Sequence, residues 1–400
     1  MIMKNLILSV VLIFATGILF AQSNTSNVLQ EGNTNESTVD QVGENNNSDV
    51  DQMTYSLGTS VNNISSVSQT GSWNNSFVWN DGDWHNSNVS QNGIRNYSYV
   101  NMWGNNSTND VNQVGNENSS YVWQWNRTND HISDVDQIGD FNYSNVRQQG
   151  GNGNESIVWQ KGLTNNSDVD QLGNTNYSKV QQFGNNNESD VLQTGDNNNS
   201  YVNQGLVDYT YNDYKGNRNY SNVNQLGDDN TSVVNQYGYY PAEDNSSYVD
   251  QIGDENYSRV YQGGNNNISD VDQIGDLNRS FVEQNSYSNN SDVDQIGDEN
   301  YSRVYQGYNS NLSKVLQTGL SNYSTVCQHS GEGNNSIVDQ MGDDNSSRVH
   351  QHGTANISLV NQTGDLNRSY SYQSGDTHNS IVNQIGNGNS SNVNQRNLMR

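Results

Sequence analysis

The sequence predicts an all-β protein, a β-solenoid built from stacked strand-turn-strand coils, and two observations carry this prediction. An eleven-residue unit, S-x-V-x-Q-x-G-x-x-N-x, repeats about 33 times between Ser26 and Gln395. Within each unit Ser, Val and Gln lie at every second position, which is the periodicity of a β-strand and places all three on one face. A fixed short period indicates a stack of equivalent units rather than a conventional globular fold.

The first part of each unit has the pattern of a half-buried strand. Val fills the third slot in all but two copies, and Gln fills the fifth in all but three, where Asn80, Met102 and Tyr214 stand instead. The intervening slots vary among Asp, Asn, Arg, Tyr and Trp, as outward positions do when the opposite face is buried. We expect strands of about five to seven residues.

The G-x-x-N segment after each strand predicts a tight turn, because Gly takes positive φ freely and Asn tolerates it. An eleven-residue period also occurs in right-handed helical supercoils. Gly, Asn, Ser and Val oppose a helix in every unit, so we reject that alternative.

Two units make one coil of 22 residues. Ser-Asp-Val-Asp-Gln recurs at 269–273 and 291–295, and the segment 251–263 reappears unchanged at 295–307. Stacked coils form two facing sheets, and about 16 rungs at ~4.8 Å each make a rod about 80 Å long. Irregular spacings at 53–61, 125–133, 206–215 and 239–244 predict insertions on one solenoid rather than domain boundaries.

Stacking in register places each core residue above its own kind. A Gln amide can then donate to one neighbouring rung and accept from the other. The end rungs are open strand edges with the same pattern, and such edges recruit further chains. We therefore predict cross-β amyloid assembly through a core ladder. Representative ladder residues are Ser269, Val271, Gln273, Gly275, Asn278, Ser280, Val282, Gln284, Ser291, Val293, Gln295, Gly297, Asn300, Ser302, Val304 and Gln306.

Composition excludes several other classes of protein. Only 30% of the 400 residues are hydrophobic, too few for a conventional core, so a disordered acidic polymer is the alternative for the free monomer. A net charge of −27 makes nucleic acid a poor partner. One cysteine, Cys327, allows no disulfide framework within the monomer.

The N-terminus has the pattern of a secretory signal peptide. Lys4 precedes an apolar run from Leu6 to Phe20, and Ala21 offers a small residue before the cleavage point. The run is shorter than the ~20 apolar residues that a membrane span needs. We expect residues 1–21 to be removed, and 22–400 to form one secreted repeat domain without a membrane span.

The string Gln-Ile-Gly-Asp-Leu-Asn-Arg-Ser-Phe-Val-Glu-Gln at 273–284 closely resembles the curlin repeat, and the likeness extends over 24–395. The resemblance implies a self-assembling β-solenoid amyloid subunit of extracellular fibres on the bacterial cell surface, with roles in biofilm matrix and adhesion. It further implies a nucleator subunit and a dedicated export pore as partners. The chain departs from the family in using Ser where Ala is common, in its larger number of repeats, and in repeats that begin within a few residues of the predicted cleavage.

Other residues provide weaker functional signals. Trp79, Trp123 and Trp159 each occupy the outward position between the Val slot and the Gln slot of their unit. They are therefore candidates for an exposed aromatic patch that serves adhesion, carbohydrate binding or lateral packing. Their alternative role is ordinary strand decoration. His350 and His352 flank an inward Gln and should point outward, where a surface pair is favoured over a metal site because no third ligand is evident.

Acidic motifs such as Asp134-Val135-Asp136 only superficially resemble a calcium loop, so solvated charge is favoured over calcium bridging between fibrils. Ser, His and Asp form no singular constellation, and we predict neither catalysis nor a cofactor. Two functions remain: a secreted fibre subunit, or a soluble monomeric β-solenoid adhesin that binds glycan or ice. The irregular, charged outward slots count against ice.

Overall fold

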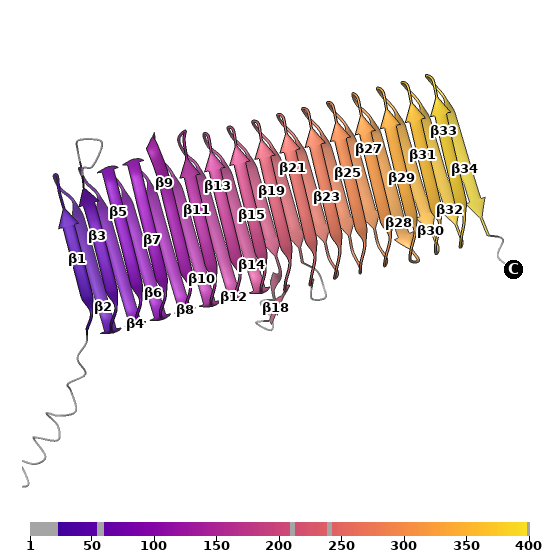
Figure 1. Cartoon of the computed structure of the whole chain (residues 1–400). Helices are drawn as coiled ribbons and strands as arrows, with labels where there is room; N and C mark the ends of the chain where they lie inside the picture. The colour runs from indigo at the N-terminus through magenta and orange to yellow at the C-terminus, as the bar shows by residue number, and fades with distance from the viewer. Residues whose placement is uncertain (1–22, 54–59, 209–212, 238–241, 398–400) are drawn as a thin grey trace, which may run out of the picture.

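The computed structural model describes residues 23–53, 60–208, 213–237 and 242–397, and within them it contains strands and no helix. Two parallel 16-stranded sheets face each other along a rod (Figure 1). Successive strands alternate between the sheets, so one rung holds one strand of each. The predicted β-solenoid of about 16 coils with about 22 residues per coil is confirmed.

We call the two sheets the odd sheet and the even sheet after their strand labels. The odd sheet consists of β1 (Thr25–Gln30), β3 (Asn47–Met53), β5 (Asn75–Asp83), β7 (Tyr97–Asn105), β9 (Ser119–Asn129), β11 (Tyr143–Gln149), β13 (Asn166–Leu172), β15 (Glu188–Thr194), β19 (Tyr220–Leu226), β21 (Ser246–Ile252), β23 (Ile268–Ile274), β25 (Asn290–Ile296), β27 (Leu312–Thr318), β29 (Asn335–Met341), β31 (Ile357–Thr363) and β33 (Asn379–Ile385). The even sheet consists of β2 (Glu36–Glu44), β4 (Ile64–Ser72), β6 (Asn86–Ile94), β8 (Thr108–Asn116), β10 (Ile132–Asp140), β12 (Glu155–Leu163), β14 (Tyr177–Asn185), β16 (Asn199–Gln204), β20 (Thr231–Gln236), β22 (Tyr257–Gln262), β24 (Arg279–Gln284), β26 (Tyr301–Gln306), β28 (Tyr323–Ser330), β30 (Ser346–His352), β32 (Arg368–Ser374) and β34 (Ser390–Arg396).

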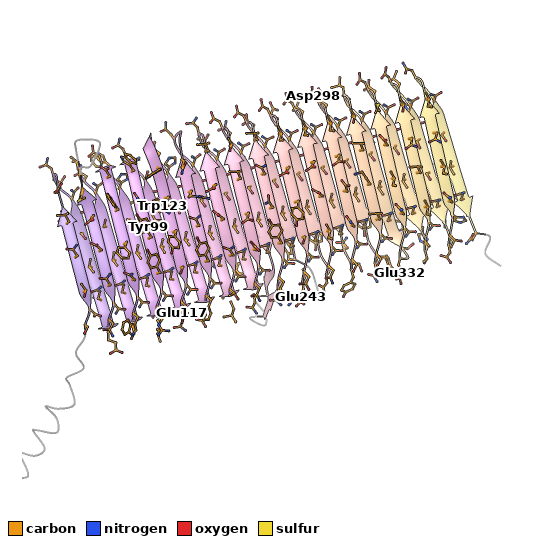
Figure 2. The ribbon with its side chains drawn as sticks, in the orientation of Figure 1. Tyr99, Glu117, Trp123, Glu243, Asp298 and Glu332 are labelled. Atoms are coloured by element: carbon orange, nitrogen blue, oxygen red, sulfur yellow. The ribbon has the colours of Figure 1, made fainter. Side chains whose placement is uncertain are left out.

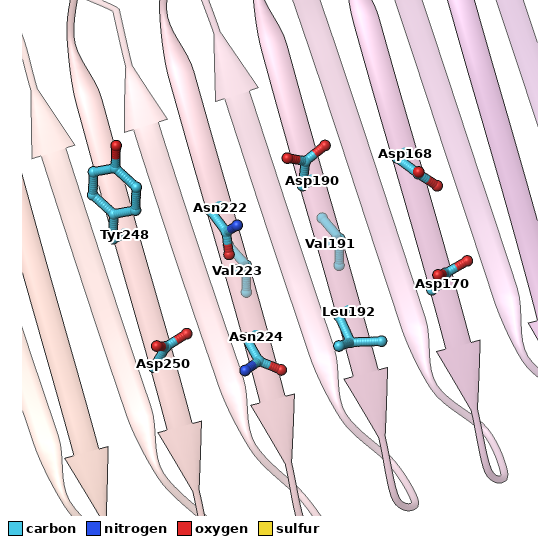
Figure 3. Close-up of a pocket in the computed structure, with 10 residues that line it drawn as sticks. All are labelled: Asp168, Asp170, Asp190, Val191, Leu192, Asn222, Val223, Asn224, Tyr248 and Asp250. Atoms are coloured by element: carbon cyan, nitrogen blue, oxygen red, sulfur yellow. The ribbon is translucent and has the colours of Figure 1, made fainter.

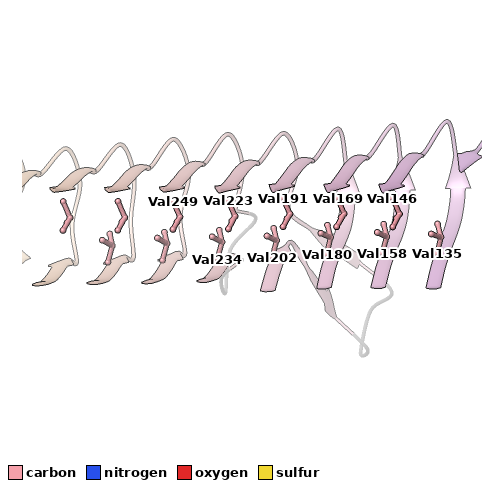
Figure 4. Packing of buried hydrophobic residues seen from close by; sticks show 14 of the residues in the cluster. Val135, Val146, Val158, Val169, Val180, Val191, Val202, Val223, Val234 and Val249 are labelled. Carbon is pink, nitrogen blue, oxygen red and sulfur yellow. The ribbon is translucent and has the colours of Figure 1, made fainter. Parts of the chain in front are cut away.

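The repeat valines form the apolar centre of the rod. Valines of both sheets point into the space between them and meet in one continuous column (Figure 4). Val169 and Val180, from opposite sheets, are both fully buried. Because Val alternates with outward residues, one side chain per strand supplies this apolar layer, flanked on the same face by Ser and Gln.

Most turns have positive φ at two positions. Gly275 has φ +112°, and a Cβ there would lie 2.4 Å from the carbonyl oxygen of Gly297 on the next rung. The second position is Leu277, with φ +61°, and not the repeat Asn as we expected. Asn278 instead points inward and is fully buried, because its side chain joins a ladder described below.

The largest described insertion is a hairpin. β17 (Leu206–Asp208) and β18 (Asp213–Lys215) pair antiparallel with each other, apart from the two large sheets. Tyr214 therefore belongs to an insertion and not to a Gln slot, and the sheets contain 32 strands rather than about 33 repeat units. Both sheets continue past the hairpin, since β15 pairs with β19 and β16 with β20.

The predicted signal peptide, residues 1–21, lies outside the described residues. Within the described part of the chain, no helix has the length and apolar character to span a membrane.

Candidate functional site: the stacked core and its open ends

The predicted core ladder lies in β23–β26 and in the turns between these strands. Its Ser, Val, Gln and Asn side chains are at most 2% exposed. The parallel register places Gln273 beside Gln295 and Ser280 beside Ser302. Like residues thus stack on like residues at every second strand of the chain.

The Gln side chains form directional hydrogen-bond ladders. Gln273 donates from Nε2 to Oε1 of Gln295 at 2.8 Å and also to the backbone oxygen of Tyr257 in the opposite sheet at 3.1 Å. Each amide therefore joins two rungs and two sheets. In the even sheet the Gln-to-Gln ladder is unbroken from Gln41 to Gln395, and every donor points toward the C-terminal rung.

The Gln ladder of the odd sheet is interrupted near the N-terminal end. Asn80 and Met102 replace Gln on β5 and β7, so Gln52 donates instead to Oγ of Ser65 at 3.0 Å. Met102 is fully buried and fills its slot with apolar volume. The ladder begins again at Gln124, whose Nε2 lies 3.0 Å from Oε1 of the next Gln.

The turn asparagines form a second type of ladder. Asn278 donates from Nδ2 to the backbone oxygen of Gly297 at 2.6 Å. Its Oδ1 accepts the backbone N–H of Asn300 at 3.0 Å. The Asn side chain thus supplies the partners that a turn backbone leaves unsatisfied between rungs. This explains a fixed Asn at a position that does not require positive φ.

The serines stack in register but make no comparable ladder. Oγ of Ser280 and of Ser302, like that of most repeat serines, is buried without a hydrogen-bond partner among the described residues. A buried hydroxyl without a partner lowers stability. The polar ladders are therefore built from amides rather than hydroxyls.

Two buried histidines, His85 and His131, replace the repeat Asn in turns that lead from the odd sheet to the even sheet. Neither was identified from the sequence. Nδ1 of His85 accepts the backbone N–H of Ser107 at 3.4 Å, and Nδ1 of His131 accepts that of Asn154 at 3.2 Å. Burial lowers the pKa of each imidazole to about 4, against an ordinary value of 6.5. Their position in the repeat could have indicated their burial, since His85 follows Gly82-Asp83-Trp84 and so occupies the position of Asn in G-x-x-N.

Both ends of the rod leave their core uncovered. Val28 on β1 is 43% exposed, whereas Val50, its neighbour on β3, is 0% exposed. Gln30 donates to Gln52 at 2.7 Å, but no described residue donates to Oε1 of Gln30. At the other end Gln395 accepts from the preceding rung, and no rung lies beyond its own Nε2. The N-terminal tip thus displays Gln acceptors and the C-terminal tip displays Gln donors.

The structure separates the three predicted tryptophans. Trp79 on β5 and Trp123 on β9 lie in the odd sheet, whereas Trp159 on β12 lies in the even sheet on the opposite side of the rod. The three side chains therefore do not form one patch. Trp159 contacts Phe183 instead, with ring centroids 5.1 Å apart.

A larger aromatic surface surrounds Trp79 and Trp123 on β5, β7, β9 and β11. In Figure 2 the labelled Tyr99 and Trp123 lie side by side on this surface, and their ring centroids are 4.9 Å apart. We call it the aromatic face. It comprises Phe77, Trp79, Tyr97, Tyr99, Trp103, Tyr121, Trp123, Trp125 and Tyr143.

An acidic groove follows on the same sheet. Asp168, Asp170, Asp190 and Asp250 line a shallow depression over β13–β21, where Asn224 is one of the smaller side chains in between (Figure 3). Burial raises the pKa of Asp168 and Asp190 above the usual carboxyl value. Among the described residues, no group of three or more His, Cys, Asp or Glu side chains has the arrangement of a metal site.

His350 and His352 both point outward from β30, as expected. His352 lies against His329, with ring centroids 5.2 Å apart. Cys327 pairs with His350 in register and is half-buried, and burial raises the pKa of its thiol.

One segment of the repeat also matches a known family of protein repeats. Residues 242–275 match the family model described as the curlin associated repeat. The matched segment spans β21–β23, one full coil and the strand that stacks on it. This segment of the chain is therefore similar to the curlin associated repeat. A search of curated proteins finds no match to this chain. The curlin-type rung seen at 242–275 is the rung that the two sheets repeat along the whole rod.

Proposed function

We propose that this curlin-repeat chain is a secreted structural subunit that polymerises end to end into an extracellular, curli-type amyloid fibre for biofilm matrix and surface adhesion. The repeated core assigns the same role to every rung, so we further propose that the chain is not an enzyme. A second copy of the chain is the principal partner. A nucleator and a dedicated export pore are further partners that the family resemblance implies.

The observation that carries this proposal is the complementarity of the two tips. The N-terminal tip displays Gln acceptors, the C-terminal tip displays Gln donors, and both tips are open parallel strand edges. A second copy added in the same orientation continues both sheets and both ladders. Such head-to-tail contacts do not close on themselves, so they build an open filament.

A charge placed on one tip tests this mechanism. Val393 points inward on β34, whereas its neighbour Asn392 points outward and is exposed. Val393→Lys places an ammonium where the next copy would dock, and Asn392→Lys adds the same charge on the outer face of the same strand. We expect wild type and Asn392→Lys to elongate from preformed seeds at similar rates, and Val393→Lys to stop elongating.

Each outcome has a defined reading. Equal elongation of the two lysine variants would contradict docking at the C-terminal tip. A wild-type chain that stays monomeric while keeping the circular dichroism of strands would favour the alternative, a soluble surface-binding solenoid. The assembled material should also give a meridional reflection near the ~4.7 Å spacing between strands, and its absence would refute the fibre.

A further inference from the structure

The aromatic face gathers nine ring side chains on adjoining strands of the odd sheet, at outward positions that vary elsewhere along the rod. The strands β5, β7, β9 and β11 each have four outward positions, counted from the residue before Ser to the residue after the Gln slot. Nine of these sixteen positions are aromatic. Three rung spacings and a seven-residue strand give it a size of roughly 14 by 20 Å. Its rings touch across rungs, for example Tyr97 with Tyr121 at 5.3 Å and Tyr121 with Tyr143 at 5.7 Å. The face is therefore a continuous platform rather than a scatter of single side chains.

Much of this platform remains in contact with solvent. Trp125 is 42% exposed and Tyr143 is 40% exposed. Contiguous exposed aromatic surface marks a site of interaction in a soluble protein. It lies on the flank of the rod and begins at the third of the sixteen rungs, so it does not include the open strand edges that the proposed end-to-end growth uses.

Carboxylates border the platform on both sides. On β3, Asp49 lies beside Phe77 and Asp51 beside Trp79. On the far side β13 carries Asp168 and Asp170. Arg147, on the last strand of the platform, does not reverse this field, because its guanidinium is already paired with Asp170 at 2.6 Å. A partner must therefore stack on aromatic rings and tolerate, or neutralise, negative charge at both margins.

A second copy of this chain does not satisfy that requirement through the same face. If two copies packed with their aromatic faces together, a two-fold axis along the rod would place the β3 aspartates of one copy opposite the β3 aspartates of the other. A two-fold axis across the rod would place them opposite the aspartates of β13. Like charges meet in either arrangement and oppose pairing. Acidic polymers are disfavoured for the same reason.

We propose that the aromatic face binds an amine-bearing polysaccharide of the glucosamine type. A pyranose ring presents apolar C–H groups that stack on the electron-rich faces of Tyr and Trp. A pyranose is about as long as one rung spacing of ~4.8 Å, so a chain lying along the rod places successive sugars over the rings of successive rungs. Ammonium groups gain from the ring faces and from the bordering aspartates, which matches both features of the surface. This binding goes beyond the fibre function and does not require polymerisation.

The test uses the full chain and soluble hexasaccharides. Titration calorimetry and tryptophan fluorescence would measure binding of the glucosamine hexamer, with cellohexaose as the uncharged comparison. Trp123→Ala, alone and with Tyr99→Ala, removes the centre of the platform. Trp159→Ala is the matched control, because it removes the same residue type from the equivalent slot of the even sheet. Circular dichroism checks that each variant keeps its strands.

We expect the glucosamine hexamer to bind wild type and Trp159→Ala equally, and Trp123→Ala about tenfold more weakly. Asp49→Asn with Asp51→Asn should reduce both the affinity and its dependence on salt. Equal binding of cellohexaose, or equal affinity of Trp123→Ala and Trp159→Ala, would overturn the proposal. It would also be overturned if Trp123→Ala abolished lateral association of the chains while no hexasaccharide bound.

Discussion

Acid should destabilise the rod first at the rungs that contain His85 and His131. Both imidazoles are 0% exposed and accept a backbone N–H through Nδ1. Protonation turns that acceptor into a donor and places a charge in the core. The fold therefore requires the neutral imidazole.

The size of the effect follows from the pKa values. Burial lowers the pKa of both histidines from 6.5 to about 4 in the folded chain. Between these two values the unfolded chain binds more protons, so the free energy of unfolding decreases as the pH falls through this window. At ~1.4 kcal/mol per pH unit the full loss is about 3 kcal/mol for each histidine.

The replacement His85→Asn with His131→Asn restores the repeat residue at both slots and should abolish this acid sensitivity. Hydrogen exchange followed by mass spectrometry, on peptides that cover β6–β12, would compare the two proteins at about pH 7 and about pH 4.5. We expect equal protection near neutral pH and faster exchange in the wild type under acid. Peptides from β24–β30 serve as an internal reference and should not differ.

Other titrating groups do not obscure the comparison. Burial raises the pKa of Asp134 and Asp272 to about 6. Protonation of these carboxyls therefore increases the free energy of unfolding as the pH falls, which is opposite to the effect of the histidines. They are present in both proteins and cancel in the difference. Identical acid dependence of the two proteins over β6–β12 would refute the role assigned to the histidines.

Three further substitutions test the ladders and the turn. Gln273→Leu with Gln295→Leu removes consecutive amides whose bonds are 2.8–2.9 Å long; it should lower the free energy of unfolding by about 2–4 kcal/mol and slow seeded elongation, and unchanged elongation would argue against the amide ladder. Ser280→Ala removes a buried hydroxyl without a described partner, so thermal unfolding should show no loss, or a gain of about 1 kcal/mol, and a clear loss would reveal an unseen partner. Leu277→Gly relieves a residue at φ +61° and should raise the melting temperature by the equivalent of about 1 kcal/mol, whereas a lower melting temperature would show that the leucine side chain contributes more than its backbone costs.

The rung could be predicted from the sequence because two periods coincide. A two-residue alternation decides which side chains face inward, and an eleven-residue repeat decides where each strand begins again. Together they place Val271 beside Val293 and Gln273 beside Gln295, as observed. No long-range information is needed, since each rung contacts only its neighbours.

The role of the turn Asn could not be predicted in the same way. Tolerance of positive φ is a local property, and it pointed to Asn278. The observed position with φ +61° is Leu277, which has no such preference. The Asn side chain instead makes two hydrogen bonds to the turn of the following rung, and these bonds appear only after the coils are stacked. The inter-rung ladder outweighs the local preference of the backbone.

Whether two residues share a sheet depends on the number of repeat units between them. Insertions change the sequence separation, so this number cannot be obtained by dividing the separation by eleven. Trp79 and Trp123 are 44 positions apart, which is four units, and they share a sheet. Trp123 and Trp159 are 36 positions apart, which is three units plus the insertions between them. An odd number of units moves a residue to the opposite side of the rod. The alternating outward pattern is the same in both sheets, so it gives no warning.

The departures from the repeat are not spread evenly along the rod. The interruptions of the Gln ladder, the buried histidines and the aromatic face all fall between β5 and β11. The C-terminal rungs are far more uniform, and the segment 251–263 recurs unchanged at 295–307. Because a solenoid rung is stabilised only by its neighbours, rungs in the body of the rod can change without altering either tip. The proposed end-to-end growth would therefore constrain the tips, and it would leave β5–β11 free for the proposed binding function and for a local response to acid.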